Sequence, residues 1–464
     1  MASKILLIST NRCDFPYPVF PLGLAMVDTA LRNAGHQTRW LDCQADSEPL
    51  DQVIAAFRPD FIGMSLRNID DVVFKRRETY FGTLISVAQA ARRLTSCPII
   101  LGGSGFSLFP ERLLELTGAD FGVRGEGEES LVRLIATLEG KADHRCIPGL
   151  VFRQDGGTRV NQPVATASGA DSGPPSRPVP LVDYYLRHSS MLNLQTQRGC
   201  AFECCYCTYP LLEGRLHRRR APDAIAAEME EMQRQGARYV FIVDSVFNSS
   251  PTHVLETCEA ICRRELKLTW GCFLRPQGLT REQMRAMARA GLAHIEFGAD
   301  SFCDPVLSAY GKKFTFDDIR QASELADASK IDYCHFLICG GPGETRATLE
   351  ETFKRSQDLP RAVILALAGM RVYPGTPLFD AARRHDRCPA GADLLEPHFY
   401  FTPELTPEEV MTRMRAYSAS ASNWIVSEPS SEYHRLADRL RRKGVVGPLW
   451  SYLALIQRVL PRAP

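Results

Sequence analysis

The feature that most constrains this chain is a short cysteine-rich segment near its middle, residues 198–207 (RGCAFECCYC). Its kernel is C-x-x-x-C-x-x-C. Residues 191–197 alternate apolar and polar side chains as a strand does, and Gly199 then lets the backbone turn sharply. The pattern predicts three thiols on a tight loop at the carboxyl end of a strand, where α/β folds place their chemistry.

Three thiols at this spacing, Cys200, Cys204 and Cys207, suit an iron–sulfur cluster. Thiolates hold a cubane cluster, and three of them leave its fourth iron open to a further ligand. A structural zinc site requires four ligands, and no further His or Cys stands nearby at zinc-finger spacing. The adjacent Cys205 points elsewhere if its neighbours bind. Two alternatives stay open at this point, a zinc loop and a chance group of buried thiols.

Strands and helices alternate on both sides of this segment. The first series predicts a doubly wound parallel sheet, with strands at 4–10, 38–42, 61–65, 98–101 and 121–123. The second series predicts six βα units of a partial TIM-like barrel, with strands at 191–197, 239–243, 267–272, 294–298, 332–338 and 362–372. Helices are expected after it at 407–420, 432–443 and 448–460. The predicted organisation is a Rossmann-like domain at 1–145, a Pro/Gly/Ser-rich linker at 146–188, the barrel at 189–385 and a small helical region at 386–464.

The composition excludes several classes of protein. The net charge is +1, so neither a nucleic acid nor an anionic membrane is expected as a partner. The longest apolar run, around 362–369, is well short of the roughly 20 residues that span a bilayer. The chain has 15 cysteines, an odd number spread over its whole length, which fits a reducing compartment. A cytoplasmic location is therefore expected.

The cysteine segment resembles the signature of the radical S-adenosylmethionine (radical SAM) enzymes. Three stretches of the first 140 residues, Pro-Tyr-Pro at 16–18, Leu-Gly-Gly-Ser-Gly at 101–105 and Gly-Glu-Gly-Glu at 125–128, resemble the B12-binding domain that precedes many radical SAM cores. The resemblance implies a 4Fe–4S cluster on Cys200, Cys204 and Cys207. It also implies that SAM binds the open iron and that cobalamin is a second cofactor.

The resemblance extends to candidate cofactor-binding residues. Tyr206 is expected to form a wall for the adenine of SAM, Asp244 and Ser245 to bind its ammonium group, and Arg275 to bind its carboxylate with a bidentate fork. Gly340 and Gly341 match a glycine motif that passes beside the adenine. The residues expected to contact cobalamin are Ser65, Arg67, Asn68, Gly102, Gly103, Ser104, Glu126 and Gly127. The D-x-H-x-x-G signature of a cobalt-ligating histidine is absent from the sequence, and Arg67 is the candidate for the lower face of the cobalt.

The resemblance implies a reaction in which a flavodoxin- or ferredoxin-type carrier reduces the cluster, SAM is cleaved to a 5′-deoxyadenosyl radical, and methylcobalamin gives its methyl group to a small-molecule substrate. The main hypothesis is a methyltransferase of natural-product or cofactor biosynthesis, with no catalytic residue assigned. The alternative is the same architecture without methylation, giving 3-amino-3-carboxypropyl transfer, rearrangement or ring formation. A third hypothesis is a B12-dependent sensor with a structural cluster.

Overall fold

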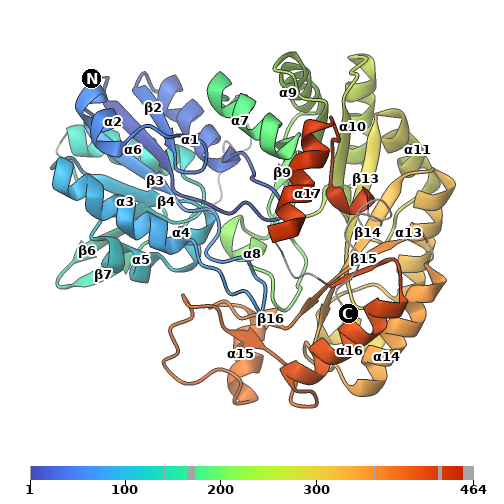
Figure 1. Ribbon diagram of the computed structural model, residues 1–464. Coiled ribbons are helices and arrows are strands. Elements are labelled where there is room, and N and C mark those ends of the chain that lie inside the picture. The colour runs from blue at the N-terminus through green and yellow to red at the C-terminus, as the bar shows by residue number, and fades with distance from the viewer. Residues whose placement is uncertain (1, 141, 165–172, 360, 427–430, 453–464) are drawn as a thin grey trace. The chain divides into compact units, whose positions relative to one another are not determined.

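The computed structural model describes residues 2–140, 142–164, 173–359, 361–426 and 431–452. They form two compact units, each with its own largely parallel sheet (Figure 1). The first unit takes the chain up to residue 71 together with residues 78–185 and 211–214. The second unit takes residues 72–77, 186–210 and the described chain from 215 onward.

The first unit is built on a seven-stranded sheet of order β2-β1-β3-β4-β5-β6-β7. The strands are β1 (Lys4–Ser9), β2 (Gln37–Asp42), β3 (Phe61–Ser65), β4 (Ile99–Gly102), β5 (Phe121–Val123), β6 (Leu150–Gln154) and β7 (Gly157–Val160). The five predicted strands, β1 to β5, are all present and parallel. Because β2 and β3 flank β1 on opposite sides, the strand order reverses there. The carboxyl ends of β1 and β3 are therefore where such a sheet opens a crevice for a ligand.

Helices cover both faces of this sheet. They are α1 (Leu22–Asn33), α2 (Leu50–Phe57), α3 (Phe81–Leu94), α4 (Ser104–Leu108), α5 (Pro110–Thr117) and α6 (Glu128–Glu139). α1 lies beside α6, and α3 lies beside α2 and α5. The four central residues of β1, Ile5 to Ile8, are all at most 1% exposed. Because successive side chains of a strand point to opposite faces, both faces of β1 must be covered.

The sheet continues beyond the predicted strands. The Pro- and Gly-rich composition predicts a linker at 146–188, whereas the structure has a β6–β7 hairpin there, antiparallel to β5, and the helix α7 (Val179–Ser189). Asp155 and Gly156 form the hairpin turn, with φ of 51° and 78°. Two positive φ angles are the geometry of the two-residue turn that an Asp-Gly pair favours.

The second unit is built on a seven-stranded, all-parallel sheet of order β18-β15-β14-β13-β12-β11-β8. The strands are β8 (Leu192–Leu194), β11 (Tyr239–Ile242), β12 (Thr269–Leu274), β13 (Leu292–Asp300), β14 (Asp332–Cys339), β15 (Val363–Ala368) and β18 (Trp424–Val426). The first six correspond to the six predicted βα units. Within the described residues, β8 and β18 are the sheet's two edges and do not pair, which agrees with a partial barrel.

The helices of the second unit line the outside of this curved sheet (Figure 1). They include α9 (Pro222–Arg234), α10 (Pro251–Arg263), α11 (Arg281–Arg289), α12 (Asp304–Ala309), α13 (Phe316–Ala328) and α14 (Arg346–Arg355). Side-chain caps fix where several begin. At α11, Thr280 Oγ1 accepts from the Gln283 N–H (3.2 Å), and Gln283 Oε1 accepts from the Thr280 N–H (2.9 Å).

The C-terminal region is only partly helical. Of the predicted helices, α16 (Pro407–Ser420) and α17 (Ser431–Arg442) are present, and the third is a short 3-10 turn, η4 (Leu449–Tyr452), beyond which the predicted range lies outside the described residues. The other elements are α15 (Pro377–Arg384), β18 and a pair of short strands, β16 (Met370–Arg371) and β17 (Phe399–Tyr400). The strand β18 also belongs to this region and extends the barrel sheet by pairing with β15.

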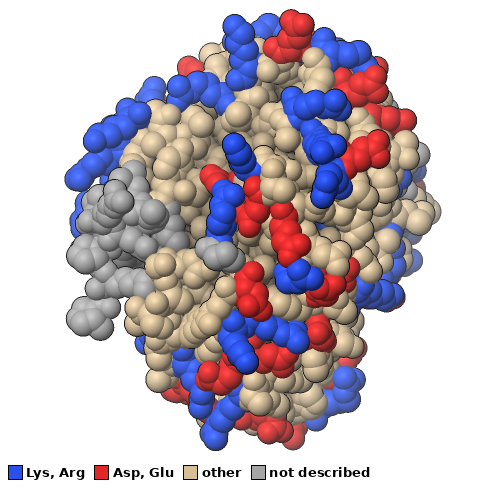
Figure 2. All heavy atoms as spheres, turned by 90° about the vertical axis from the view of Figure 1, so that its right-hand side faces the viewer, with Lys and Arg blue, Asp and Glu red and all other residues tan. Residues whose placement is uncertain are grey.

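Charged side chains of both signs are mixed over the face of the molecule in Figure 2. Many pair along the helices, as Arg320 does with Asp317 at 2.5 Å on α13. No helix in the described ranges combines the length and apolar character that crossing a membrane requires.

Candidate functional site

The cysteine loop follows the short strand β9 (Gln197–Arg198), which comes after β8 in the second unit. Cys200 is 6% exposed, and Cys204 and Cys207 are half-buried. Burial raises the pKa of Cys204, and it raises that of Cys207 to about 12. The three sulfurs also act on one another, because Cys200 raises the pKa of Cys204, and both raise that of Cys207. The loop therefore brings the three predicted ligands close together.

Cys205 differs from these three in how it is held. Its backbone N–H donates to the carbonyl oxygen of Tyr310 (2.9 Å), and its carbonyl oxygen accepts from the N–H of Leu378 (2.8 Å). Burial raises the pKa of its thiol to about 12. Cys205 therefore anchors the loop to the barrel through its backbone, which leaves Cys200, Cys204 and Cys207 as the candidate ligands.

The donor set fits a cluster better than a single ion. A zinc ion requires its ligands to converge on one point. A cubane takes each thiolate on a different iron, so its ligands lie farther apart. Three thiols on one short loop are the donor set that a 4Fe–4S cluster takes.

Asp244 lies after β11 and holds the residues that lead into the cysteine loop. Its Oδ1 accepts from the backbone N–H groups of Thr196 (2.7 Å) and Gln197 (3.2 Å), and its Oδ2 accepts from the Thr196 hydroxyl. The side chain is fully buried. The neighbouring Ser245 donates to the carbonyl oxygen of Gly199 (3.0 Å). Both residues therefore contact the loop, and their predicted contact with SAM stays a prediction.

Arg275 follows β12 and lies near the cysteines. Its guanidinium carbon is 4.1 Å from the ring centre of Phe202 and 5.0 Å from that of Phe314, and its Nη2 donates to Gln277 Oε1 (2.9 Å). Burial lowers its pKa, whereas the charges of Cys204 and Cys200 raise it. Stacking on two rings fixes the plane of the guanidinium group. The paired N–H donors of this group match the two oxygens of a carboxylate.

Two charged residues that no sequence motif marks also reach the cysteine loop. The side chains of Lys312 and Asp300 are only 7% and 3% exposed and form an ion pair of 2.6 Å. Tyr206, one of the predicted SAM residues, donates its hydroxyl to the same Asp300 oxygen (2.5 Å). Burial lowers the pKa of Lys312, but Asp300 and Cys204 outweigh it and raise the pKa above its usual value. Only the folded chain brings these two residues to the cysteines.

Gly340 and Gly341 follow β14 and pack against aromatic side chains. A Cβ atom at Gly340 would lie 2.8 Å from the Phe401 ring, and one at Gly341 would lie 2.4 Å from the Tyr310 hydroxyl. The Tyr310 hydroxyl accepts from the N–H of Gly341 (3.1 Å) and donates to Ile338 O (2.8 Å). Tyr310 therefore links this glycine loop to the cysteine loop through its backbone contact with Cys205.

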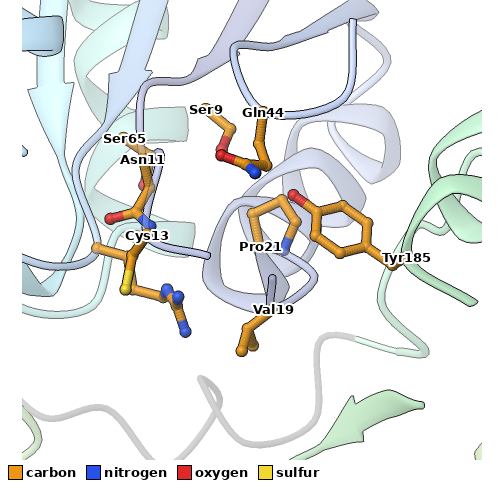
Figure 3. A pocket seen from close by; sticks show the side chains of 9 residues that line it. Ser9, Asn11, Cys13, Val19, Pro21, Gln44, Ser65 and Tyr185 are labelled. Atoms are coloured by element: carbon orange, nitrogen blue, oxygen red, sulfur yellow. The ribbon is translucent and has the colours of Figure 1, made fainter. Parts of the chain in front are cut away.

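A pocket opens in the first unit at the carboxyl ends of β1 and β3, where the strand order reverses (Figure 3). It is lined by Ser9, Asn11, Cys13, Val19, Pro21, Gln44, Ser65, Arg67 and Tyr185. Two of the predicted cobalamin residues, Ser65 and Arg67, are among them. Tyr185 comes from α7, within the range whose composition predicts a linker, and donates to the buried Asp42 (2.8 Å). Burial raises the pKa of Asp42 to about 6.

The remaining predicted cobalamin residues lie at neighbouring strand ends. Gly103 has φ of +97°, and a Cβ there would lie 2.4 Å from the carbonyl oxygen of Leu66. Ser104 donates to the carbonyl oxygen of Arg67 (2.8 Å). Asn68 has a buried Oδ1 without a hydrogen-bond partner among the described residues. A tight turn at which only glycine fits lets a large ligand approach the backbone. A buried acceptor without a partner can accept a hydrogen bond from a polar group of that ligand. Asn68, Gly103 and Ser104 do not line the pocket, and neither do Gly102, Glu126 and Gly127.

Comparison with known families assigns both units. The family model described as "Radical SAM superfamily" matches residues 194–355, which include the cysteine loop. The family model described as "B12 binding domain" matches residues 9–135, which include the ends of β1 and β3. The chain belongs to the radical SAM enzymes that carry a B12-binding domain. The prediction of the family and of its α/β fold is thereby confirmed.

Relatives of this radical SAM enzyme are found among curated proteins. The tryptophan 2-C-methyltransferase of Streptomyces laurentii is 28% identical over 77% of this chain and 71% of its own length. The anaerobic magnesium-protoporphyrin IX monomethyl ester cyclase of Rubrivivax gelatinosus is 24% identical over 89% of this chain and 75% of its own length.

A solved structure shares the whole fold of this radical SAM enzyme. The radical SAM methyltransferase TsrM from Kitasatospora setae, with cobalamin and a 4Fe–4S cluster bound, superposes with a TM-score of 0.89. The match covers 99% of this chain and 98% of that one at 23% identity. The main prediction, a radical SAM enzyme of the cobalamin-dependent methyltransferase type with a cluster, SAM and cobalamin as cofactors, is confirmed at the level of the family.

Proposed function

We propose that this chain transfers a methyl group from SAM, by way of cobalamin, to a small molecule. The proposal is carried by one combination of features. Three thiols lie on the loop after β9, and a pocket lies at the strand-order reversal of a B12-binding domain. TsrM has been solved with tryptophan and a SAM analogue bound, and a curated relative is a tryptophan methyltransferase. L-Tryptophan is therefore the first substrate to test.

The proposed roles of the residues are supported by their positions. Bound cluster, SAM and cobalamin supply the electron-transfer and methyl-carrier chemistry. Cys200, Cys204 and Cys207 hold the cluster, and Arg275 offers its oriented fork to the SAM carboxylate. The further SAM residues are Tyr206, Asp244, Ser245, Gly340 and Gly341. In the first unit, Ser65 and Arg67, which line the pocket, would hold cobalamin together with Asn68 and the Gly103 turn, and Arg67 is the candidate for its lower face. A flavodoxin- or ferredoxin-type carrier supplies the electron in the cytoplasm.

The test uses anaerobically reconstituted protein with cobalamin, a reductant, trideuteromethyl-SAM and a panel of small molecules headed by L-tryptophan. Wild type and Cys205→Ala should form S-adenosylhomocysteine and a product that carries the labelled methyl group. Cys200→Ala should form neither, because its cluster is lost. S-Adenosylhomocysteine formation that does not depend on cobalamin contradicts the proposal.

Ring formation is a second candidate, because the cyclase from Rubrivivax gelatinosus matches 89% of the chain. A cyclase leaves the methyl group of SAM on methionine. Consumption of a panel substrate without incorporation of the deuterated methyl group therefore favours this second function.

A further inference from the structure

One segment of the first unit, residues 173–185, lies beyond the range 9–135 that the B12-binding family model matches. We call this segment the strap. It ends at Tyr185, whose side chain is only 2% exposed and lines the pocket at the ends of β1 and β3. Figure 3 shows its hydroxyl on the side of Gln44 and Pro21, two other lining residues. One wall of the pocket therefore comes from outside the matched domain.

The strap is attached to α1 by hydrogen bonds near its start. Thr29 Oγ1 donates to the carbonyl oxygen of Pro174 (3.1 Å) and accepts from the backbone N–H of Ser176 (2.9 Å). The same N–H also donates to the carbonyl oxygen of Ala25 (3.3 Å). Thr29 Oγ1 shares its hydrogen with Ala25 O in its own helix (3.1 Å). A single threonine side chain therefore fixes where the strap crosses α1.

Two neighbours hold the side chain of Tyr185. Its hydroxyl donates to Oδ2 of Asp42 (2.8 Å), a fully buried carboxylate at the end of β2. Its ring packs edge-on against Phe20, with 5.6 Å between the ring centres. A tyrosine hydroxyl has a single hydrogen, so an oxygen that has given it to Asp42 can only accept further hydrogen bonds. Tyr185 therefore offers the pocket an acceptor in a fixed position.

An acceptor in this place matches the chemistry of cobalamin. The corrin ring carries amide side chains around its edge, and their N–H groups donate hydrogen bonds. A buried polar group of a ligand requires such a partner, because an unpaired donor away from water costs free energy.

We propose that Tyr185, carried by the strap and held by Asp42, binds cobalamin by accepting a hydrogen bond from a corrin amide. The strap is thus part of the cobalamin site, although the family's own domain ends before it. The inference rests on the proposed function, because it takes cobalamin as the ligand of this pocket.

The test is the dissociation constant of hydroxocobalamin, measured by equilibrium dialysis and visible absorbance on the whole chain with its cluster reconstituted. Tyr185→Phe keeps the ring and loses the acceptor, so the dissociation constant should rise about fivefold, as for the loss of one hydrogen bond. Tyr185→Ala also removes the ring and should raise the constant further. Denaturant unfolding of the cobalamin-free protein measures any loss of stability separately.

Thr29→Val tests the strap without touching the pocket. It removes the hydroxyl that bonds Pro174 and Ser176, so the dissociation constant should rise by about twofold or more. The matched control is Thr137→Val on α6, because the Thr137 hydroxyl donates to Arg133 O within its own helix (2.7 Å). This control should bind hydroxocobalamin as wild type does. Thr29→Val carries the test if neither Tyr185 variant folds.

Wild-type affinity in Tyr185→Phe overturns the inference, whether or not the variant is less stable, because the hydroxyl would then serve only to pair with Asp42. Equal affinities in Thr29→Val and Thr137→Val overturn the role of the strap. A wild-type protein that binds no hydroxocobalamin overturns the proposed function itself.

Discussion

Asp244 shows how a single buried carboxylate can set the geometry of a loop. Both of its oxygens accept hydrogen bonds from the residues before the cysteines. Asp244→Asn replaces one carboxylate oxygen, which accepts hydrogen bonds, with an amide nitrogen that would face the N–H or hydroxyl donors of the loop. We therefore expect a loss of about 1–3 kcal/mol in the free energy of unfolding. We also expect less iron per chain after reconstitution without SAM. Denaturant unfolding and iron analysis measure these effects.

The control for this prediction is Asp223→Asn on α9. Asp223 pairs with Arg263 at the surface, where its side chain is 76% exposed, so its loss should change neither stability nor iron content. Full iron content in Asp244→Asn together with weaker SAM binding would contradict a role in holding the loop and favour the predicted SAM contact.

Gly103 is a second position where one residue decides local structure. Its φ is +97°, and a Cβ atom at this position would lie only 2.4 Å from Leu66 O, which leaves no room for a side chain. Gly103→Ala should lower the free energy of unfolding by about 1–3 kcal/mol and reduce cobalamin retention, measured by visible absorbance after gel filtration. Gly82→Ala on α3 is the control, because nothing lies within 4 Å of a Cβ there. Equal cobalamin retention in both variants would contradict the prediction.

At the level of elements, the η4 turn packs against the barrel strand β13. Trp450 Nε1 donates to Glu296 Oε1 on β13 (2.9 Å), and its ring lies 5.6 Å from that of His294. Trp450→Ala should cost about 3–5 kcal/mol of stability, since it removes a buried ring. Trp450→Phe keeps most of the packing and should cost about 1–3 kcal/mol, from the lost hydrogen bond. Urea unfolding compares them, and equal losses would contradict the hydrogen bond's contribution.

The same contact predicts a pH dependence. Burial raises the pKa of Glu296 to about 7, and the hydrogen bond from Trp450 opposes this shift. Because the folded pKa lies above the unfolded one, the stabilising effect is complete below about pH 4.5 and is lost as pH rises through about 7. Between pH 5 and 8, wild type should lose about 1–3 kcal/mol relative to Glu296→Gln, which stays neutral. Parallel stability profiles would contradict a buried carboxyl at this position.

The elements that sequence could predict are those whose pattern is local. Runs such as Lys4–Ser9 form buried parallel strands, and the three cysteines share one short loop. The Asp155-Gly156 turn is a local signal for the β6–β7 hairpin, but the many Gly and Pro residues around it favour a linker. β18 has three residues and depends on pairing with β15. Lys312 pairs with Asp300, twelve residues earlier in the chain, and no local pattern marks this pair.

At the level of the whole molecule, two α/β units each offer a site at the carboxyl ends of parallel strands. The first has its pocket at the reversal between β1 and β3. The second has its cysteine loop after β9. Neither site alone explains methyl transfer by way of cobalamin, because one domain supplies the methyl carrier and the other the cluster and SAM. The proposed reaction therefore depends on a 4Fe–4S cluster held by Cys200, Cys204 and Cys207.

The most direct test is elemental and sulfide analysis of anaerobically reconstituted wild type, Cys200→Ala and Cys205→Ala. The account predicts about four irons and about four sulfides per chain in wild type and in Cys205→Ala, and a loss of most of both in Cys200→Ala. Zinc in place of iron in the wild-type protein, or a full cluster in Cys200→Ala, would contradict it.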